Sequence, residues 1–241
     1  MNIIWQEANV HTKIFFRERQ AVFWGFIFPI LLLVLFCSVF GGTPERSTML
    51  VAGLICINVM SGALFATGVV MVAAREQGIL RRYKAAPVAL WKIITGLLIS
   101  RLIAITLTTT LLLAMARYFY HILLPTNLVA MIAVFATGAL MFCAIAFAVA
   151  SVARSVAQAN GLVQIIFMPM MFLSGATFPS ELMPLWMQKV AQILPSSYYV
   201  SGLKSVMLTG GGLSDNAVNL AVMGAFILIS VGISTRFFRW E

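Results

Sequence analysis

Few residues of this 241-residue chain have the chemistry of a catalyst or a metal ligand. There are two histidines, His11 and His121, and three cysteines that each lie inside an apolar run, Cys37, Cys56 and Cys143. They form no H-E-x-x-H motif, no CxxC pair and no His–Cys cluster, so the sequence predicts neither a metal site nor a nucleophilic catalyst. We expect the cysteines to be small packing residues and the chain itself not to be an enzyme.

Nucleotide and copper sites are the other chemistry to weigh. A P-loop needs the motif G-x-x-x-x-G-K-[ST], and the dipeptide Gly-Lys occurs nowhere in the sequence. The thioethers of Met168, Met170 and Met171 suit Cu(I), but no Cys or His pair accompanies them, and packing is the commoner role of methionine. The sequence therefore predicts no metal and no cofactor held by this chain.

The composition indicates a membrane protein. Apolar residues make up 61% of the chain and charged residues only 10%, whereas soluble domains average about 25% charged residues. The formal net charge of +9 fits basic residues at cytoplasmic helix ends better than a nucleic-acid surface, because no basic stripe alternates with aromatics. We predict an all-α fold, since only helices satisfy their own backbone within each membrane segment.

Six stretches are long and apolar enough to cross a bilayer core of about 30 Å. They lie at about 21–42, 49–74, 95–116, 127–153, 157–178 and 216–236. We expect one transmembrane domain over 1–241, preceded by an amphipathic helix at 3–19 that lies in the membrane interface. The connection 179–215 is long but apolar, which favours short or re-entrant helices that cap the bundle.

Six spans place both termini on one side of the membrane, and the basic residues indicate which side. Eleven of the 16 Lys and Arg residues fall on the side of the termini. By the positive-inside rule, both termini are predicted to be cytoplasmic, in a multi-pass protein of the cytoplasmic (inner) cell membrane. The opposite side holds only four basic residues, Arg46, Arg117, Lys189 and Lys204.

Polar residues inside the predicted spans are candidates for a substrate path. No span contains Asp or Glu, which disfavours a stand-alone proton or sodium carrier. Asn160 and Gln164 share one face of the fifth span, and Asn58 lies in the second. Such residues either line a path or hydrogen-bond across neighbouring helices. Met168 and Met171 continue the fifth span and suit an adaptable apolar lining.

Arg101 is the one charge within a predicted span. An arginine that faces lipid at the bilayer centre costs about 2.5–3.5 kcal/mol on insertion scales. We therefore expect Arg101 to face protein or water, or to extend its head group to the inner interface. It is also a candidate for the substrate path.

Two segments carry recognisable motifs. After the second span, residues 75–88 read REQGILRRYKAAPV; after the fifth, 174–179 read SGATFP, followed by LPSSYY at 194–199. They resemble the R-E-x-G-x-L-x-x-x-x-x-x-P-V loop and the S-G-x-x-F-P and L-P-x-x-Y motifs of type-2 ABC transporter permeases, the membrane subunits of ATP-driven drug, lipid and polysaccharide exporters. The resemblance follows the order of elements along the whole chain. Ile79 departs from it, because many relatives have a small polar residue there.

The resemblance implies an exporter permease that works as a homo- or heterodimer in membrane lipid. Each copy would contact an ABC ATPase (nucleotide-binding) subunit, which binds the ATP and Mg. Segment 75–92 would form a coupling helix on that ATPase. The residues that the resemblance implies for coupling are Arg75, Glu76, Gly78, Leu80, Arg81, Arg82, Tyr83, Lys84 and Pro87. Those of the outer-loop motif are Gly175, Phe178, Pro179, Pro195, Tyr198 and Tyr199.

The residues of the coupling segment agree with that role. Ile79, Leu80 and Tyr83 give an apolar edge with basic residues around it, and Pro87 ends the helix. A short rigid helix passes a rigid-body movement from one subunit to another. The alternative is that these charges only set the topology.

The sequence leaves the substrate open. An apolar, Met- and Phe-rich domain favours a hydrophobic or amphiphilic substrate, such as a drug, an antibiotic or a lipid-like molecule. The alternatives are export of a polysaccharide or lipid-linked glycan, and a non-transporting scaffold or sensor of the same fold. The outer aromatics favour an interfacial aromatic belt over a sugar channel; they are Phe172, Phe178, Trp186, Tyr198 and Tyr199.

Overall fold

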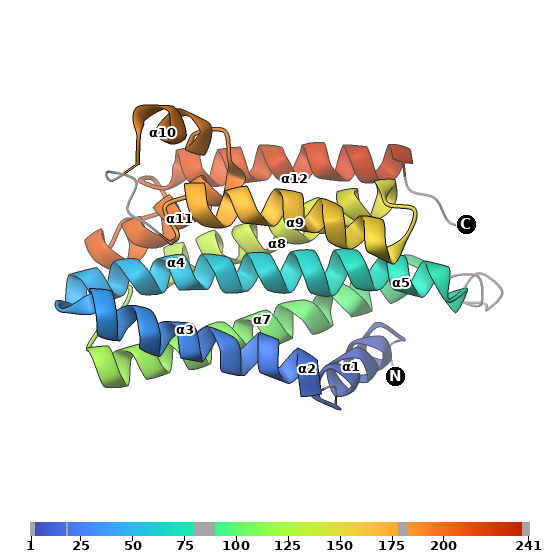
Figure 1. The fold of residues 1–241 in the computed structure, drawn as a ribbon, viewed down its shortest axis with the longest axis horizontal. Coiled ribbons are helices and arrows are strands. Elements are labelled where there is room, and N and C mark those ends of the chain that lie inside the picture. Colours follow the sequence, from blue (N-terminus) through green and yellow to red (C-terminus); the bar gives the residue numbers. More distant parts are fainter. Residues whose placement is uncertain (1–2, 18, 80–89, 178–182, 238–241) are drawn as a thin grey trace.

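The computed structural model describes residues 3–17, 19–79, 90–177 and 183–237, and every element within them is helical (Figure 1). Five of the described helices are long and apolar enough to cross a membrane: Pro44–Glu76, Thr95–Tyr120, Leu128–Val152, Val156–Leu173 and Ala217–Phe237. A shorter apolar helix, Gly25–Gly41, precedes them. The predicted all-α membrane class is confirmed over these residues.

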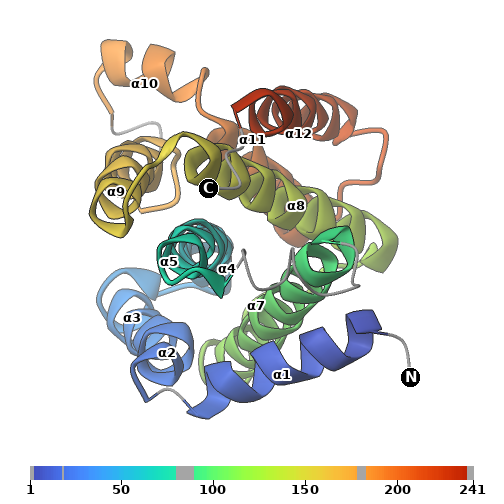
Figure 2. The ribbon, with the colours of Figure 1, turned by 90° about the vertical axis from the view of Figure 1, so that its right-hand side faces the viewer.

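The N-terminal part forms two helical runs. Helix α1 (Ile3–Arg17) lies across α7 (Leu90–Tyr120) in the end-on view of Figure 2. Ala8 of α1 is buried, whereas Trp5, Ile14 and Lys13 are exposed, as suits a helix in a membrane interface. The next run is continuous and contains two π-helical turns: α2 (Arg19–Val22), η1 (Phe23–Ile27), α3 (Phe28–Phe36) and η2 (Cys37–Gly41).

The helix at the centre of the bundle is the most deeply buried. It comprises α4 (Pro44–Ala63), η3 (Leu64–Val69) and α5 (Val70–Glu76), and it lies between α3, α7, α8 and α9 in Figure 2. Thr43 begins α4 because its side-chain oxygen accepts a hydrogen bond from the Arg46 backbone N–H at 3.3 Å. Pro44 occupies the first helical position, where its missing N–H has no cost.

Helices α8 (Leu128–Val152) and α9 (Val156–Leu173) each begin after a residue whose side chain caps the helix. Asn127 accepts from the backbone N–H of Ala130 at 3.0 Å, and Ser155 accepts from that of Gln158 at 3.1 Å. Helix α7 runs from Leu90 to Tyr120, beyond the predicted 95–116. The span prediction stopped short of the charged residues Lys92 and Arg117, whereas the helix continues through both.

The segment before the last helix folds into short helices. They are α10 (Leu185–Ala191), α11 (Pro195–Lys204) and the π-helical turn η5 (Ser205–Thr209), followed by α12 (Ala217–Phe237). Helix α11 packs against α4, α8, α9 and α12. Gly210 ends η5 in the left-handed conformation at φ 66°, which costs glycine no steric strain.

The connections gather at the two ends of the bundle (Figure 1). One end carries α1, the end of α5, the link between α8 and α9, and the end of α12. The other end carries the connections around 42–43 and 121–127 and the described residues 174–177 and 183–216. The long helices therefore run back and forth between two surfaces, as a polytopic membrane domain requires.

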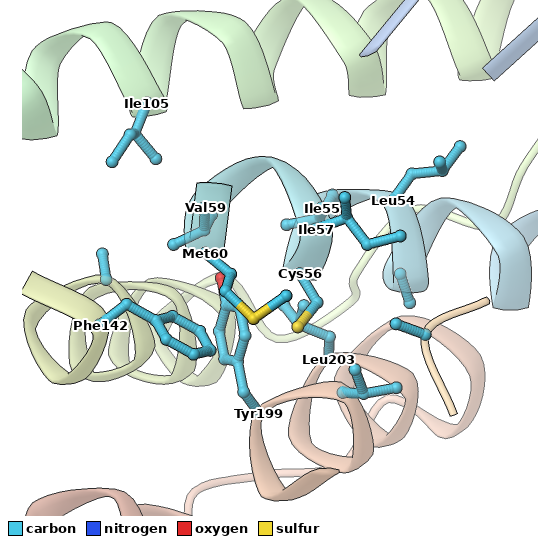
Figure 3. Close-up of a cluster of buried hydrophobic side chains, with 14 of the residues drawn as sticks. Leu54, Ile55, Cys56, Ile57, Val59, Met60, Ile105, Phe142, Tyr199 and Leu203 are labelled. Atoms are coloured by element: carbon cyan, nitrogen blue, oxygen red, sulfur yellow. The ribbon is translucent and has the colours of Figure 1, made fainter. Parts of the chain in front are cut away.

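Tyr199 of α11 occupies the centre of the core. Figure 3 shows its ring beside Phe142 of α8 and below Met60 of α4. The two rings meet edge to face, with their centroids 5.8 Å apart and an interplanar angle of 75°. Tyr199 is 0% exposed, so its assignment to an aromatic belt is wrong: the short helix α11 carries this ring away from the interface.

Gly138 of α8 makes room for that ring. A Cβ at this position would lie 2.3 Å from the Cδ2 and Cε2 atoms of Tyr199. We expect Gly138→Ala to lower the free energy of unfolding by about 1–3 kcal/mol, the usual cost of overpacking. Thermal unfolding in detergent measures the loss, and Tyr199→Leu in the same chain should recover part of it. A Gly138→Ala variant as stable as wild type would contradict this packing.

Candidate functional site

Helix α5 ends where the predicted coupling segment begins. The backbone N–H of Gln77 donates to the Ala73 carbonyl at 3.0 Å, and that of Gly78 donates to the Arg75 carbonyl at 3.0 Å. Gly78 adopts φ 70°, the left-handed conformation in which glycine commonly ends a helix. Leu80, Arg81, Arg82, Tyr83, Lys84 and Pro87 lie outside the described residues, so the coupling role of this segment stays a prediction.

Arg75 and Glu76 lie against the α8–α9 link. The Arg75 guanidinium donates to the backbone carbonyls of Ala150, at 3.5 Å, and Ala153. A Glu76 carboxylate oxygen accepts from the backbone N–H of Val156 at 3.0 Å. The last turn of α5 is thereby joined to the end of α8 and the start of α9.

The link itself is held by a capping arrangement that the sequence analysis missed. Ser155 and Gln158 have the S-x-x-Q spacing of a capping box. Besides the Ser155 cap, the Gln158 side-chain oxygen accepts from the Arg154 backbone N–H at 2.8 Å. The S-x-x-Q pattern was the signal that could have located this helix start.

Two of the predicted path residues lie inside the bundle. Asn58 is buried in α4, and its amide donates to the Thr109 hydroxyl of α7 at 3.3 Å, a polar contact between helices. Arg101 of α7 is only 9% exposed, which satisfies the expectation that it avoids lipid. In the preceding residue, the Ser100 hydroxyl lies 3.0 Å from that of Thr12 on α1.

His11 of α1 lies close to this region. Burial lowers its pKa, the nearby Glu7 carboxylate partly opposes that shift, and the Arg101 charge lowers the pKa further. The His11 Nε2 and a Glu7 carboxylate oxygen are 3.7 Å apart, one turn along α1. The Arg101 charge therefore acts on His11 of α1, although about 90 residues of sequence separate them.

The other predicted path residues lie on α9, at the outside of the bundle (Figure 2). Asn160 and Gln164 are exposed, and Met168 is 42% exposed. Met171 is half-buried and packs against the core. The candidate path residues therefore do not gather in one cavity of a single chain: Asn58 and Arg101 face inward and the α9 amides face outward.

The outer-loop motif folds back into the bundle. The Lys204 ammonium of α11 donates to the Gly175 carbonyl at 3.0 Å, and the Thr177 hydroxyl donates to the Met171 carbonyl at 2.9 Å. The next peptide, at Ala176, lies against Gly53 of α4. Lys204 is therefore a structural residue that sequence reasoning counted only as an outer-side charge.

The second half of that motif builds α11. Pro195 is buried at the first helical position of α11, and the Tyr198 hydroxyl donates to the Gln192 carbonyl at 2.8 Å. Phe178 and Pro179 lie outside the described residues. Trp186 and Phe172 are 61% and 44% exposed, and their place in an interfacial belt stays a prediction.

The described residues contain no group of three or more His, Cys, Asp or Glu side chains that could hold a metal ion. The three cysteines are all buried and free. The structure therefore provides two candidate functional features. One is the set of helix connections around Arg75 and Glu76 at one end of the bundle, and the other is the exposed, partly polar face of α9.

Comparison with known proteins identifies membrane transport proteins that are similar to this chain. A family profile described as ABC-2 type transporter matches residues 4–208. The probable multidrug ABC transporter permease YbhR of Escherichia coli is 27% identical over 163 residues, which cover 68% of this chain and 44% of that protein. The putative transport permease YvfS of Bacillus subtilis is 25% identical over 236 residues, which cover 95% of this chain and 96% of that protein.

A further relative, the inner membrane transport permease YhhJ of Escherichia coli, is 22% identical over 179 residues, covering 72% of this chain and 48% of that protein. The chain therefore spans less than half the length of YbhR and YhhJ and nearly the full length of YvfS.

Proposed function

The chain belongs to the ABC-2 type transporter family, and from this we propose that it is the permease subunit of an ATP-binding cassette exporter, driven by a separate ATPase subunit. The family match and the apolar helices support a multi-pass membrane transport permease subunit. The proposal extends to the number of spans, the coupling segment, the substrate path and the substrate.

The proposed topology has six spans with both termini in the cytoplasm. Helix Gly25–Gly41 has 17 residues, which is the lower end of the range that crosses a bilayer. With the five longer helices it makes an even number of crossings, in agreement with α1 and the end of α12 lying at one end of the bundle (Figure 1). The positive-inside rule supports assigning that end to the cytoplasmic side of the inner membrane.

Segment 75–92 is the proposed contact with the ATPase. It starts in the last turn of α5, at the proposed cytoplasmic end, and it carries Arg81, Arg82 and Lys84. In this mechanism, ATP binding closes two ATPase subunits, the coupling helices move, and two permease copies shift against each other. The ATP and Mg are bound by the partner, since this sequence has no P-loop.

The exposed face of α9 is the proposed side of the path between two permease copies. An amide that faces lipid lacks hydrogen-bond partners, which costs free energy. The exposure of Asn160 and Gln164 therefore supports a protein or aqueous neighbour on this face. Ile165, Met168 and Phe172 on the same face are exposed and apolar, which suits a hydrophobic or amphiphilic substrate such as a drug, an antibiotic or a lipid-like molecule.

Reconstitution tests the function. The chain is co-expressed with the ATP-binding cassette ATPase encoded nearest to it, and the complex is purified into liposomes. We expect the ATPase to co-purify and an amphiphilic drug to stimulate ATP hydrolysis several-fold and to be transported. Stimulation by a lipid-linked glycan instead would select the glycan alternative. No substrate-stimulated hydrolysis with either ligand would contradict transport and favour the scaffold or sensor alternative.

A further inference from the structure

The ends of three helices meet at Arg75 and Glu76, two adjacent residues of opposite charge. The Arg75 guanidinium binds the last carbonyls of α8, and the Glu76 carboxylate binds the first N–H of α9. These are the groups that a helix leaves without intrahelical partners. The C-terminus of a helix carries partial negative charge and its N-terminus partial positive charge, so each side chain meets the helix end that favours it.

The apolar residues beneath this contact hold the same elements together. Met71 and Val72 of α5, Ala150 of α8 and Ala159 of α9 belong to one buried cluster, with Leu97 of α7. Ala153, whose carbonyl accepts from Arg75, is 1% exposed and belongs to the same cluster. Arg75 and Glu76 therefore lie at one end of this buried cluster. There they join α5 to the α8–α9 link, which is about 75–80 residues away in the sequence.

We propose that Arg75 and Glu76 are positioning residues that make the end of α5 and the start of α9 move together. This inference rests on the proposed function, in which the ATPase acts on the coupling segment that contains the end of α5. Val156 is one helical turn from Asn160, one of the two exposed path candidates with an amide side chain on α9. A displacement at the end of α5 therefore reaches the proposed path through two hydrogen-bonded helix ends, without passing through the long span of α4.

The distance between two spin labels tests the contact itself. Labels are placed on Lys13→Cys of α1 and Arg154→Cys of the α8–α9 link, two residues with exposed side chains at the same end of the bundle. The three native cysteines are buried, so the introduced thiols label selectively. We expect a narrow distance distribution in the wild-type background, broadened at least about twofold by Arg75→Met or Glu76→Ala.

Conservative and matched variants separate positioning from general stability. Glu76→Gln keeps an oxygen that can accept from Val156 and should keep the narrow distribution. Glu45→Ala removes an exposed carboxylate from the first turn of α4, at the opposite end, and should also keep it. An unchanged distribution in Arg75→Met and Glu76→Ala would overturn the proposal.

Transport in the reconstituted complex tests the consequence. In purified complexes that carry Arg75→Met or Glu76→Ala, we expect the amount of substrate moved per ATP hydrolysed to fall about tenfold; Glu76→Gln should restore it. Unchanged transport per ATP in the two disruptive variants would defeat this inference alone. A wild-type chain with the narrow distribution but no ATP-driven transport would defeat the proposed function, and this inference with it.

Discussion

Replacing Arg81, Arg82 and Lys84 together by glutamate will abolish ATP-driven transport. The three residues lie in the segment that we propose to contact the ATPase, and reversing their charges places like charges where opposite ones met. Juxtaposed like charges at an interface cost several kcal/mol, which corresponds to a loss of affinity of about a hundredfold or more. Co-purification of the ATPase and the initial rate of transport in liposomes measure the effect.

The matched control reverses the same number of charges at the same end of the molecule. Lys13 and Arg17 of α1 and Arg236 of α12 are all exposed, and their replacement by glutamate should leave the ATPase bound. Charge reversal could also invert the chain in the membrane, and an inverted chain would not bind the ATPase either. Leu213→Cys, in the exposed connection before α12, is therefore labelled with an impermeant maleimide in both variants to report the orientation of the chain. Wild-type binding and transport in the first variant would contradict the coupling assignment.

Local chemistry made much of the fold predictable. The length of the apolar runs indicated where the long helices lie, and the caps at Thr43, Asn127 and Ser155 are residue types that favour a helix start. Their boundaries were less predictable, as α7 illustrates by extending from Leu90 to Tyr120. The charged residues Lys92 and Arg117 bound the uncharged stretch, yet the helix continues through both of them.

The partners of the charged and aromatic residues could not be read from the sequence. Arg75 and Glu76 look like loop residues, yet they bind the ends of helices about 75–80 positions away. Tyr199 looks like an interfacial aromatic, yet a short helix buries it against Phe142. Periodicity reports which face of a helix is apolar, but not which distant element packs against it.

The same reasoning separates the candidate path residues. The i, i+4 spacing of Asn160 and Gln164 correctly indicated a shared face, and both side chains are exposed on α9. Spacing did not distinguish this pair from Asn58, which is buried and hydrogen-bonded to Thr109. A polar residue in a span has two roles available, and only its neighbours in three dimensions decide between them.

Gly53→Ala will strongly destabilise the chain, because the outer-loop motif occupies the space that a Cβ needs. That atom would lie 1.9 Å from the carbonyl oxygen of Ala176 and 2.8 Å from its carbonyl carbon. Unlike the tip of a flexible side chain, this peptide cannot rotate away, since the Lys204 ammonium holds the adjoining Gly175 carbonyl. We expect the free energy of unfolding, from thermal unfolding in detergent, to fall by more than about 3 kcal/mol, above the usual range for overpacking.

Two other helix glycines provide the control for this substitution. Cβ atoms at Gly161 of α9 and Gly224 of α12 would meet no heavy atom within 4 Å, so alanine there should be neutral or stabilising by up to about 1 kcal/mol through helix propensity. If Gly53→Ala does not survive purification, labelling of Thr177→Cys in intact membranes replaces the unfolding measurement. Thr177 is half-buried and bonded to Met171, so its thiol should react faster once Ala176 is displaced. Gly53→Ala and Gly224→Ala gain the same helix propensity and differ only in what the new methyl group contacts. If Gly53→Ala unfolds and is labelled like Gly224→Ala, the packing of the outer loop on α4 is contradicted.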